Sequence, residues 1–110
     1  MAVNSDLMRG VAEPVILNLL NNKKMYGYEI IKVVNEKTNN AFQWKEGTLY
    51  PCLHRLEAAK LIESEWQIAE NNKARKYYTL TRKGAAVLVE KKEEWAVFAK
   101  SVNVLLNATA

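Results

Sequence analysis

The chain has 110 residues, of which 49% are hydrophobic and 25% charged, and its 16 Lys and Arg against 12 Asp and Glu give a net charge of +4. A chain of this length forms one domain, and its composition argues against a disordered or collagen-like protein. This positive net charge is compatible with a polyanionic partner but does not require one.

The scarcity of Cys and His excludes most catalytic and metal sites. Cys52 and His54 are the only residues of their kinds, so an internal disulfide, a thiolate zinc cage and a His-based nucleophilic triad are all unavailable. We therefore predict that the protein is not an enzyme and has no catalytic residue, metal or cofactor. No apolar run approaches the roughly 20 residues that cross a bilayer, and residues 1–9 lack a secretion signal. These features predict a cytoplasmic protein without a membrane partner.

The first predicted elements are two helices. Apolar residues recur every three or four positions over 7–20, which predicts a helix with one broad buried face. Because a proline inside a helix removes a backbone hydrogen bond, this helix either begins near Glu13 or bends at Pro14. A second helix is predicted over about 26–38, with Ile30 and Val34 on its apolar face.

A third helix is predicted over about 46–60, with Pro51 in or near its first turns. Its inward stripe consists of Leu49, Cys52, Leu53 and Leu56. We interpret Cys52 as a small buried hydrophobe, with a redox switch as the alternative.

Two strands are predicted next. Residues 61–69 alternate with a period of two, which is typical of a strand exposed on one side, and 75–80 have the same character. The polar segment 70–74 between them is prone to turns, so the pair predicts a hairpin.

A single long helix is predicted from about residue 82 to 106, with Thr81 as its N-cap. Such a helix extends about 37 Å at 1.5 Å per residue, which is longer than a small head can cover. Part of its apolar stripe therefore needs a partner, and we expect a homodimer built from residues 82–110 that joins two heads formed by residues 1–81. The expected dimer interface consists of Leu88, Trp95, Phe98, Val102 and Leu105.

The order of three helices, a hairpin and a long helix is typical of a winged helix-turn-helix. Three segments resemble the PadR family of bacterial transcriptional regulators: Tyr-Gly-Tyr-Glu-Ile at 26–30, Gly-Thr-Leu-Tyr-Pro followed by Leu-His-Arg-Leu-Glu within 47–57, and Arg-Lys-Tyr-Tyr-Thr-Leu-Thr-Arg-Lys-Gly at 75–84. The resemblance spans about 7–106, and the single C-terminal helix resembles the smaller PadR subfamily. Pro14 and the wing residue Ala74 depart from the family pattern.

The resemblance implies a mainly α winged-helix fold and sequence-specific binding of double-stranded DNA. In the third helix, short polar and aromatic side chains lie off the buried stripe and suit a major groove about 12 Å wide, and the segment 73–83 carries five cations and no acid. The predicted DNA-binding residues are Tyr28, Thr48, Tyr50, Pro51, His54, Lys73, Arg75 and Lys76. For Tyr28 the alternative is packing, and for Arg55 the alternatives are a DNA contact or a brace to an acidic neighbour, either near Glu57 or at Glu29.

The resemblance further implies a homodimeric repressor that binds a two-fold symmetric operator and is released by a small-molecule effector. Trp95 is the candidate ligand residue, because two copies of its indole can meet at the dimer interface and hold a planar aromatic molecule. The further candidate wall residues are Met8, Val89, Phe98 and Ala99. Two alternative functions remain open at this point: a protein-interaction adaptor that does not touch DNA, and a dimer whose primary role is to bind aromatic ligands.

Overall fold

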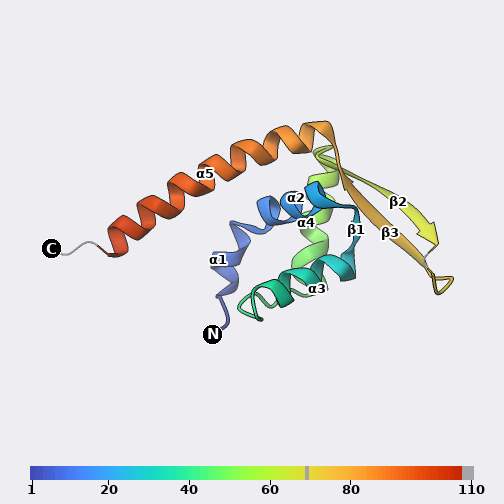
Figure 1. The fold of residues 1–110 in the computed structure, drawn as a ribbon, viewed down its shortest axis with the longest axis horizontal. Coiled ribbons are helices and arrows are strands. Elements are labelled where there is room, and N and C mark those ends of the chain that lie inside the picture. The colour runs from blue at the N-terminus through green and yellow to red at the C-terminus, as the bar shows by residue number, and fades with distance from the viewer. Residues whose placement is uncertain (69, 108–110) are drawn as a thin grey trace.

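The computed structural model describes residues 1–68 and 70–107 of the chain. Its elements in chain order are α1 (Ser5–Arg9), α2 (Ala12–Asn22), β1 (Met25–Tyr26), α3 (Gly27–Lys37), α4 (Glu46–Ala58), β2 (Ile62–Ile68), β3 (Ala74–Leu80) and α5 (Arg82–Leu106). Helices α1 to α4 form a head, from which the β2–β3 hairpin projects at one end while α5 runs out at the other (Figure 1). The predicted mainly α fold with a hairpin and a long terminal helix is confirmed.

The first predicted helix is in fact two helices. Helix α1 ends at Arg9, and α2 begins at Ala12. Pro14 is the third residue of α2, where its missing N–H belongs to the first turn and has no partner within the helix. Of the two alternatives for Pro14, the structure has a helix that begins close to Glu13.

A third strand, which the sequence analysis did not predict, completes the sheet. Strand β1 pairs antiparallel with β3, so that Met25 lies opposite Tyr78 and Tyr26 lies opposite Tyr77, and the strand order is β1-β3-β2. Two residues are too few to produce a visible alternation, which explains why the pattern was missed. The strand ties the first residue of α3 to the middle of the hairpin.

The core lies beneath α4, whose predicted stripe of four apolar residues is buried. Trp44, in the loop before α4, is 2% exposed. The Asn35 side chain fixes this loop, since its amide donates to the Trp44 carbonyl at 3.1 Å and its oxygen accepts from the Trp44 N–H at 2.8 Å. These contacts set the point at which α4 begins.

The hairpin has two faces that alternate along its strands. The cross-strand pairs define an inner face, which is continuous with the core and consists of Ile62, Ser64, Trp66, Ile68, Ala74, Lys76, Tyr78 and Leu80. The outer face consists of Glu63, Glu65, Gln67, Arg75, Tyr77 and Thr79. The two predicted strands are present. A strand exposed on one side should be covered on the other, but the inner face is covered only near the head. The hairpin extends past the head, and Trp66 on the inner face is 67% exposed. Ala69, at the end of the predicted strand, lies outside the described residues.

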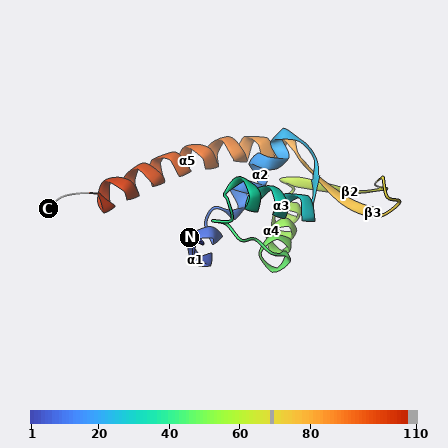
Figure 2. The same ribbon diagram turned by 60° about the horizontal axis from the view of Figure 1, so that its bottom comes forward.

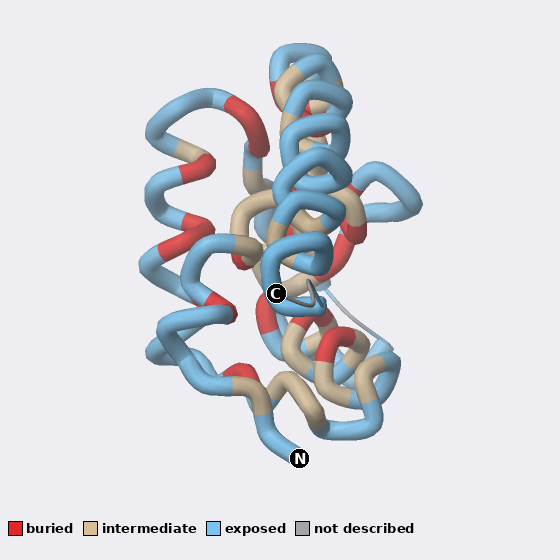
Figure 3. The backbone as a smooth tube through the Cα atoms, turned by 90° about the vertical axis from the view of Figure 1, so that its left-hand side faces the viewer, coloured by how far each residue is buried: buried red, intermediate tan, exposed pale blue. Residues whose placement is uncertain are grey.

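Helix α5 begins and ends where the sequence predicted. The Thr81 hydroxyl accepts a hydrogen bond from the Gly84 N–H at 3.0 Å, which confirms the predicted N-cap. Only the first turns pack on the head, and the rest of the helix is largely exposed (Figure 3). Residues 108–110 of the predicted dimerisation segment lie outside the described residues. Within the described ranges, no helix combines the length and apolarity needed to cross a bilayer.

Candidate nucleic-acid interface

Helix α4 presents one face to solvent on the outside of the head (Figure 2). At 100° per residue, the centre of this face lies opposite the buried stripe and contains small or uncharged residues. We call these four residues the α4 crest: Gly47, Pro51, His54 and Ala58, all of them exposed. The crest has neither a carboxylate nor a long side chain, so another molecule can approach the helix closely along it.

Tyr50 lies on one flank of the crest and has a packing role that the sequence did not reveal. Its phenol ring occupies the space where a side chain at Gly27 would begin. The ring thereby fills the gap between α4 and the start of α3, while 37% of the residue stays exposed. Gly27 is therefore required for the contact between these helices, and Tyr28, one residue later, is 63% exposed.

Thr48 and Arg55 lie on the other flank and are exposed. The Arg55 guanidinium approaches the Glu13 carboxylate of α2, with Nε 3.9 Å from Oε1, and donates to Cys52 Sγ at 3.1 Å. The bracing alternative for Arg55 thus matches the geometry, but the expected partner Glu29 is wrong, because Glu29 is paired with Lys23 at 3.0 Å. A half-exposed pair of this kind contributes little stability by itself and mainly orients the side chain.

The inner face of the hairpin is joined to α4 through Glu57. The Ser64 hydroxyl donates to Glu57 Oε2 at 2.5 Å, and Lys76 Nζ lies 3.9 Å from Oε1 of the same carboxylate. Lys76 also lies 5.7 Å from the centre of the Tyr78 ring. Lys76 is therefore on the same side of the hairpin as α4, as a DNA contact requires, and is already partly neutralised.

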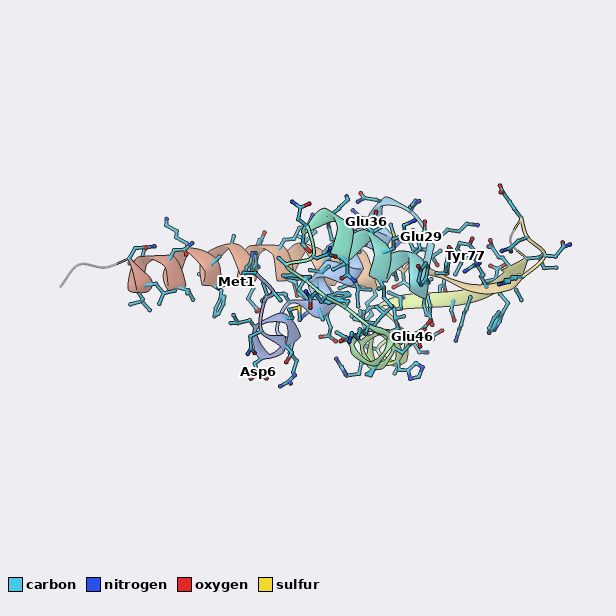
Figure 4. The ribbon with its side chains drawn as sticks, turned by 90° about the horizontal axis from the view of Figure 1, so that it is seen from below. Met1, Asp6, Glu29, Glu36, Glu46 and Tyr77 are labelled. Atoms are coloured by element: carbon cyan, nitrogen blue, oxygen red, sulfur yellow. The ribbon has the colours of Figure 1, made fainter. Side chains whose placement is uncertain are left out.

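Arg75 points the other way. Its guanidinium carbon lies 4.3 Å from the centre of the Tyr26 ring, and Tyr26 packs edge-on against Tyr77 at 5.5 Å. Lys24 donates to Gln67 at 3.0 Å in the same cluster. Figure 4 shows Tyr77 on the α3 side of the hairpin and Glu46, the first residue of α4, on the opposite side. Arg75 and Lys76 thus occupy opposite faces, as strand alternation requires.

Lys73 lies in the hairpin turn and is exposed. Its backbone N–H donates to the Asn71 side chain at 3.2 Å, and Asn72 before it has φ 61°. Asn tolerates this left-handed conformation better than most residues, because its short side chain hydrogen-bonds locally. The turn therefore holds Lys73 at the tip of the hairpin.

The predicted ligand residues are not gathered into one cavity within a single chain. Met8 is buried in the head core, whereas Trp95, Phe98 and Val89 are 48%, 57% and 57% exposed on α5. Trp95 and Phe98 do pack together, with ring centres 5.7 Å apart. Val89 lies about 120° around the helix from Trp95, so it belongs to a different face. A shallow open groove on α5 includes Phe98 but not Trp95.

The predicted interface residues of α5 differ in exposure. Leu88 is 3% exposed because it packs on the head, while Leu105 is 76% exposed. Val102 and Ala99 are partly exposed. Leu88 therefore belongs to the head core within one chain, and the remaining stripe begins at Trp95. In the part of the chain that the structure describes, no three His, Cys, Asp or Glu side chains form a cluster able to hold a metal ion.

Comparison with known proteins identifies a family. Residues 16–90 match the family described as "Transcriptional regulator PadR-like family". An uncharacterized protein of Lysinibacillus sphaericus is 39% identical over 104 residues, which cover 94% of this chain and 95% of that protein. The transcriptional regulator YqjI of Escherichia coli is 34% identical over 80 residues, which cover 73% of this chain but 37% of that longer protein. A transcriptional regulator from Clostridium thermocellum has a solved structure with a TM-score of 0.83, 37% identity and coverage of 93% of this chain and 96% of its own.

The buried phenol at the wing junction predicts a pH dependence of folding. Burial first, and then the negative charge of Glu57 and the neighbouring Tyr50, raise the pKa of Tyr78 above its ordinary value of 10.0. The folded state holds this proton to higher pH than the unfolded chain, so the stabilisation is complete below about pH 10 and is lost as the pH rises through the raised pKa. We expect the free energy of unfolding to fall more steeply above pH 10 in the wild type than in Tyr78→Phe, by up to about 1.4 kcal/mol per pH unit. Urea unfolding at a series of pH values measures both slopes.

The matched control is Tyr28→Phe, which removes an exposed phenol instead. Its slope above pH 10 should equal that of the wild type. Equal slopes in the wild type and Tyr78→Phe would contradict the assignment.

Proposed function

The chain belongs to the PadR-like family of transcriptional regulators, and we propose that it is a homodimeric repressor that binds a two-fold symmetric DNA operator through α4 and the hairpin. PadR regulators bind DNA and are typically dimers, and the family consists of regulators, not enzymes. The operator, the repressor role and the effector described below are parts of this proposal.

The observation that carries the proposal is the exposed crest of α4 beside a hairpin that has Lys76 on the same side and an exposed Lys73 at its tip. A helix in the major groove reads base edges through the side chains on its outer face, and the α4 crest is an exposed outer face without a carboxylate. Pro51 and His54 occupy the centre of the crest, where side chains reach base edges. Thr48 and Tyr50 flank it, and Tyr28, at the start of α3, can reach a phosphate through its exposed hydroxyl.

The hairpin supplies the backbone contacts. We assign the phosphate contacts of the wing to Lys73, which is exposed at the tip, and to Lys76, which lies on the inner face toward α4. Arg75 stacks on Tyr26 on the outer face, so we assign it the role of holding the wing in place. A DNA contact by Arg75 therefore requires the duplex to reach around the hairpin.

The apolar stripe of α5 supports the dimer. The turns of α5 that pack on the head use Gly84 and Leu88, and the same helix face continues as Trp95, Val102 and Leu106 beyond the head. A large apolar face that no described element of the chain covers is typical of an interface. A second copy related by a two-fold axis would cover this stripe and place two α4 helices on successive turns of one DNA face.

We propose that an aromatic effector acts at the same interface. Trp95 and Phe98 present two half-exposed rings near the middle of the stripe, so two protomers bring four rings together. A planar molecule between the rings would alter the spacing of the heads, weaken the fit to the operator and release the DNA.

The proposed roles of phosphate contacts and groove contacts predict two kinds of effect on DNA affinity. Lys73→Ala should weaken binding to the operator and to random duplex by the same factor and reduce the salt dependence of affinity, since it removes a phosphate contact. His54→Ala and Tyr50→Ala should cost about 1–3 kcal/mol on the operator and much less on random duplex, since they alter the groove contacts. Fluorescence anisotropy between 50 and 200 mM salt measures both, with an operator selected from a random pool. Equal losses on both duplexes in all three variants would contradict these roles.

The dimer prediction has a matched pair of variants on α5. Val102 lies on the stripe and Val104 about 160° away from it, although the two are separated by one residue. Val102→Glu should produce monomers at micromolar concentration, because it would bury a carboxylate in the interface, whereas Val104→Glu should stay dimeric. Sedimentation velocity distinguishes the two outcomes. A wild-type monomer at micromolar concentration would overturn the proposed function.

The effector prediction uses proflavine, a planar aromatic cation, added to the protein without DNA. We expect micromolar dye to quench tryptophan emission in the wild type, and we expect Trp95→Ala to lose most of this effect, because the dye stacks on that indole. Trp66→Phe is the control and should retain it. Undiminished quenching in Trp95→Ala would remove Trp95 from the effector site.

A further inference from the structure

The wing carries a large apolar side chain that nothing in the head covers. Trp66 is 67% exposed in the middle of β2, and Ile68, two residues further along, is 77% exposed. Their exposure is a property of the hairpin, which extends past the head (Figure 1). An exposed Trp in a strand that projects into solvent gains stability only when another molecule covers it.

The position of Trp66 relative to α4 follows from the sheet register. Ser64 hydrogen-bonds to Glu57 of α4 at 2.5 Å, and Trp66 follows it on the same face of the strand. Two residues of a strand span about 7 Å, so the indole begins about one side chain beyond the point where the hairpin meets α4. A duplex that lies along the α4 crest therefore passes in front of Trp66.

Charge favours DNA as the occupant. Along the described residues of β2 and β3, the inner face bears one charged side chain, Lys76, which is directly opposite Trp66. The carboxylates of Glu63 and Glu65 lie on the outer face. Glu70 lines a hollow together with Arg75 and Tyr77 of that outer face. The strand surface around Trp66 is therefore apolar with one cation, which the Glu57 carboxylate of α4 partly offsets, and the described strand residues of this face include no carboxylate that would repel the phosphates of a nucleic acid.

We infer that Trp66 is a DNA contact of the wing, in which the indole packs on the deoxyribose groups of the backbone next to the groove that α4 enters, while Lys76 neutralises a neighbouring phosphate. This inference rests on the proposed function and adds a residue that the cation pattern of the sequence did not single out. A contact with sugars neutralises no phosphate and reads no base edge. It therefore adds affinity without adding salt dependence or sequence preference.

The affinity test uses Trp66→Ala, with Trp66→Phe as the conservative variant and Val97→Ala as the matched control. Val97 on α5 is also 67% exposed and lies far along the chain from the wing. We expect Trp66→Ala to lose 5- to 30-fold in affinity for the selected operator and for random duplex alike, with an unchanged slope of log affinity against log salt. Trp66→Phe should retain most of the affinity, and Val97→Ala should retain all of it.

A second measurement does not depend on a substitution that could perturb the wing. The chain has three Trp residues, and 5-fluorotryptophan labelling gives each a ¹⁹F resonance, of which Trp66→Phe identifies one. Saturating operator should remove the solvent isotope shift of the Trp66 resonance. The Trp44 resonance, from a side chain that is 2% exposed, should not respond.

Each remaining outcome overturns the inference in a recognisable way. If the operator binds and His54→Ala lowers its preference, but Trp66 stays accessible and Trp66→Ala binds normally, the inference fails and the proposed function stands. If Trp66 becomes protected on raising the protein concentration without DNA, a second copy of the chain is the occupant. If Trp66→Ala reduces the salt slope, the residue acts through the phosphate contacts of Lys76. If no duplex is selected or bound, the proposed function fails and this inference fails with it.

Discussion

The orientation of the two functional helices depends on one junction, where the end of α4 meets the start of α5. Gly84 lies against the Leu61 carbonyl so closely that a Cβ at this position would collide with it. The Thr81 hydroxyl donates to the Lys60 carbonyl at 2.8 Å while it caps α5, and Lys83 Nζ donates to a carbonyl at the end of α4 at 3.2 Å. These contacts are directed at the backbone and hold the first turn of α5 against the segment that follows α4. The direction in which α5 leaves the head is thereby fixed relative to the α4 crest.

The two faces of the β2–β3 hairpin, which forms the wing, make different contacts. On the outer face, the stack of Arg75, Tyr26 and Tyr77 ties the hairpin to β1 and to the start of α3. On the inner face, Glu57 holds Ser64 and Lys76 against α4. A cation stacked on an aromatic ring contributes about 0.5–1 kcal/mol at an exposed site, so several such contacts are needed to hold a projecting hairpin. The half of the cation cluster that supports the wing is thus distinct from the half available to a ligand.

The features that the sequence predicted correctly depend on residues close together in the chain, and those that it missed depend on residues far apart in the chain. The α4 stripe, the Thr81 cap and the bounds of α5 follow from periodicity and local hydrogen bonds, so they were predicted correctly. The partner of Arg55, the ring of Tyr50 over Gly27 and the stack of Arg75 on Tyr26 join residues that are distant in sequence, and no local pattern contains them. The same limit applies to the candidate site. Alternation separated Arg75 from Lys76, but only the register and Glu57 identify which face turns toward α4.

In the proposed dimer, the junction and the stripe would let an interface far from the DNA affect binding. Trp95 lies one heptad beyond Leu88, the last residue of α5 that the head buries. In that dimer, a change in packing at Trp95 would act on the free part of α5, whose first turn is held against the segment that follows α4 through Gly84 and Thr81. Rigid levers convert a small rotation at an interface into a larger displacement at their far ends, which is how subunit rotations act in other oligomers. Two α4 helices that must match successive turns of one duplex tolerate little such displacement. A regulator built in this way needs no contact between effector and DNA, because the spacing of the heads carries the signal.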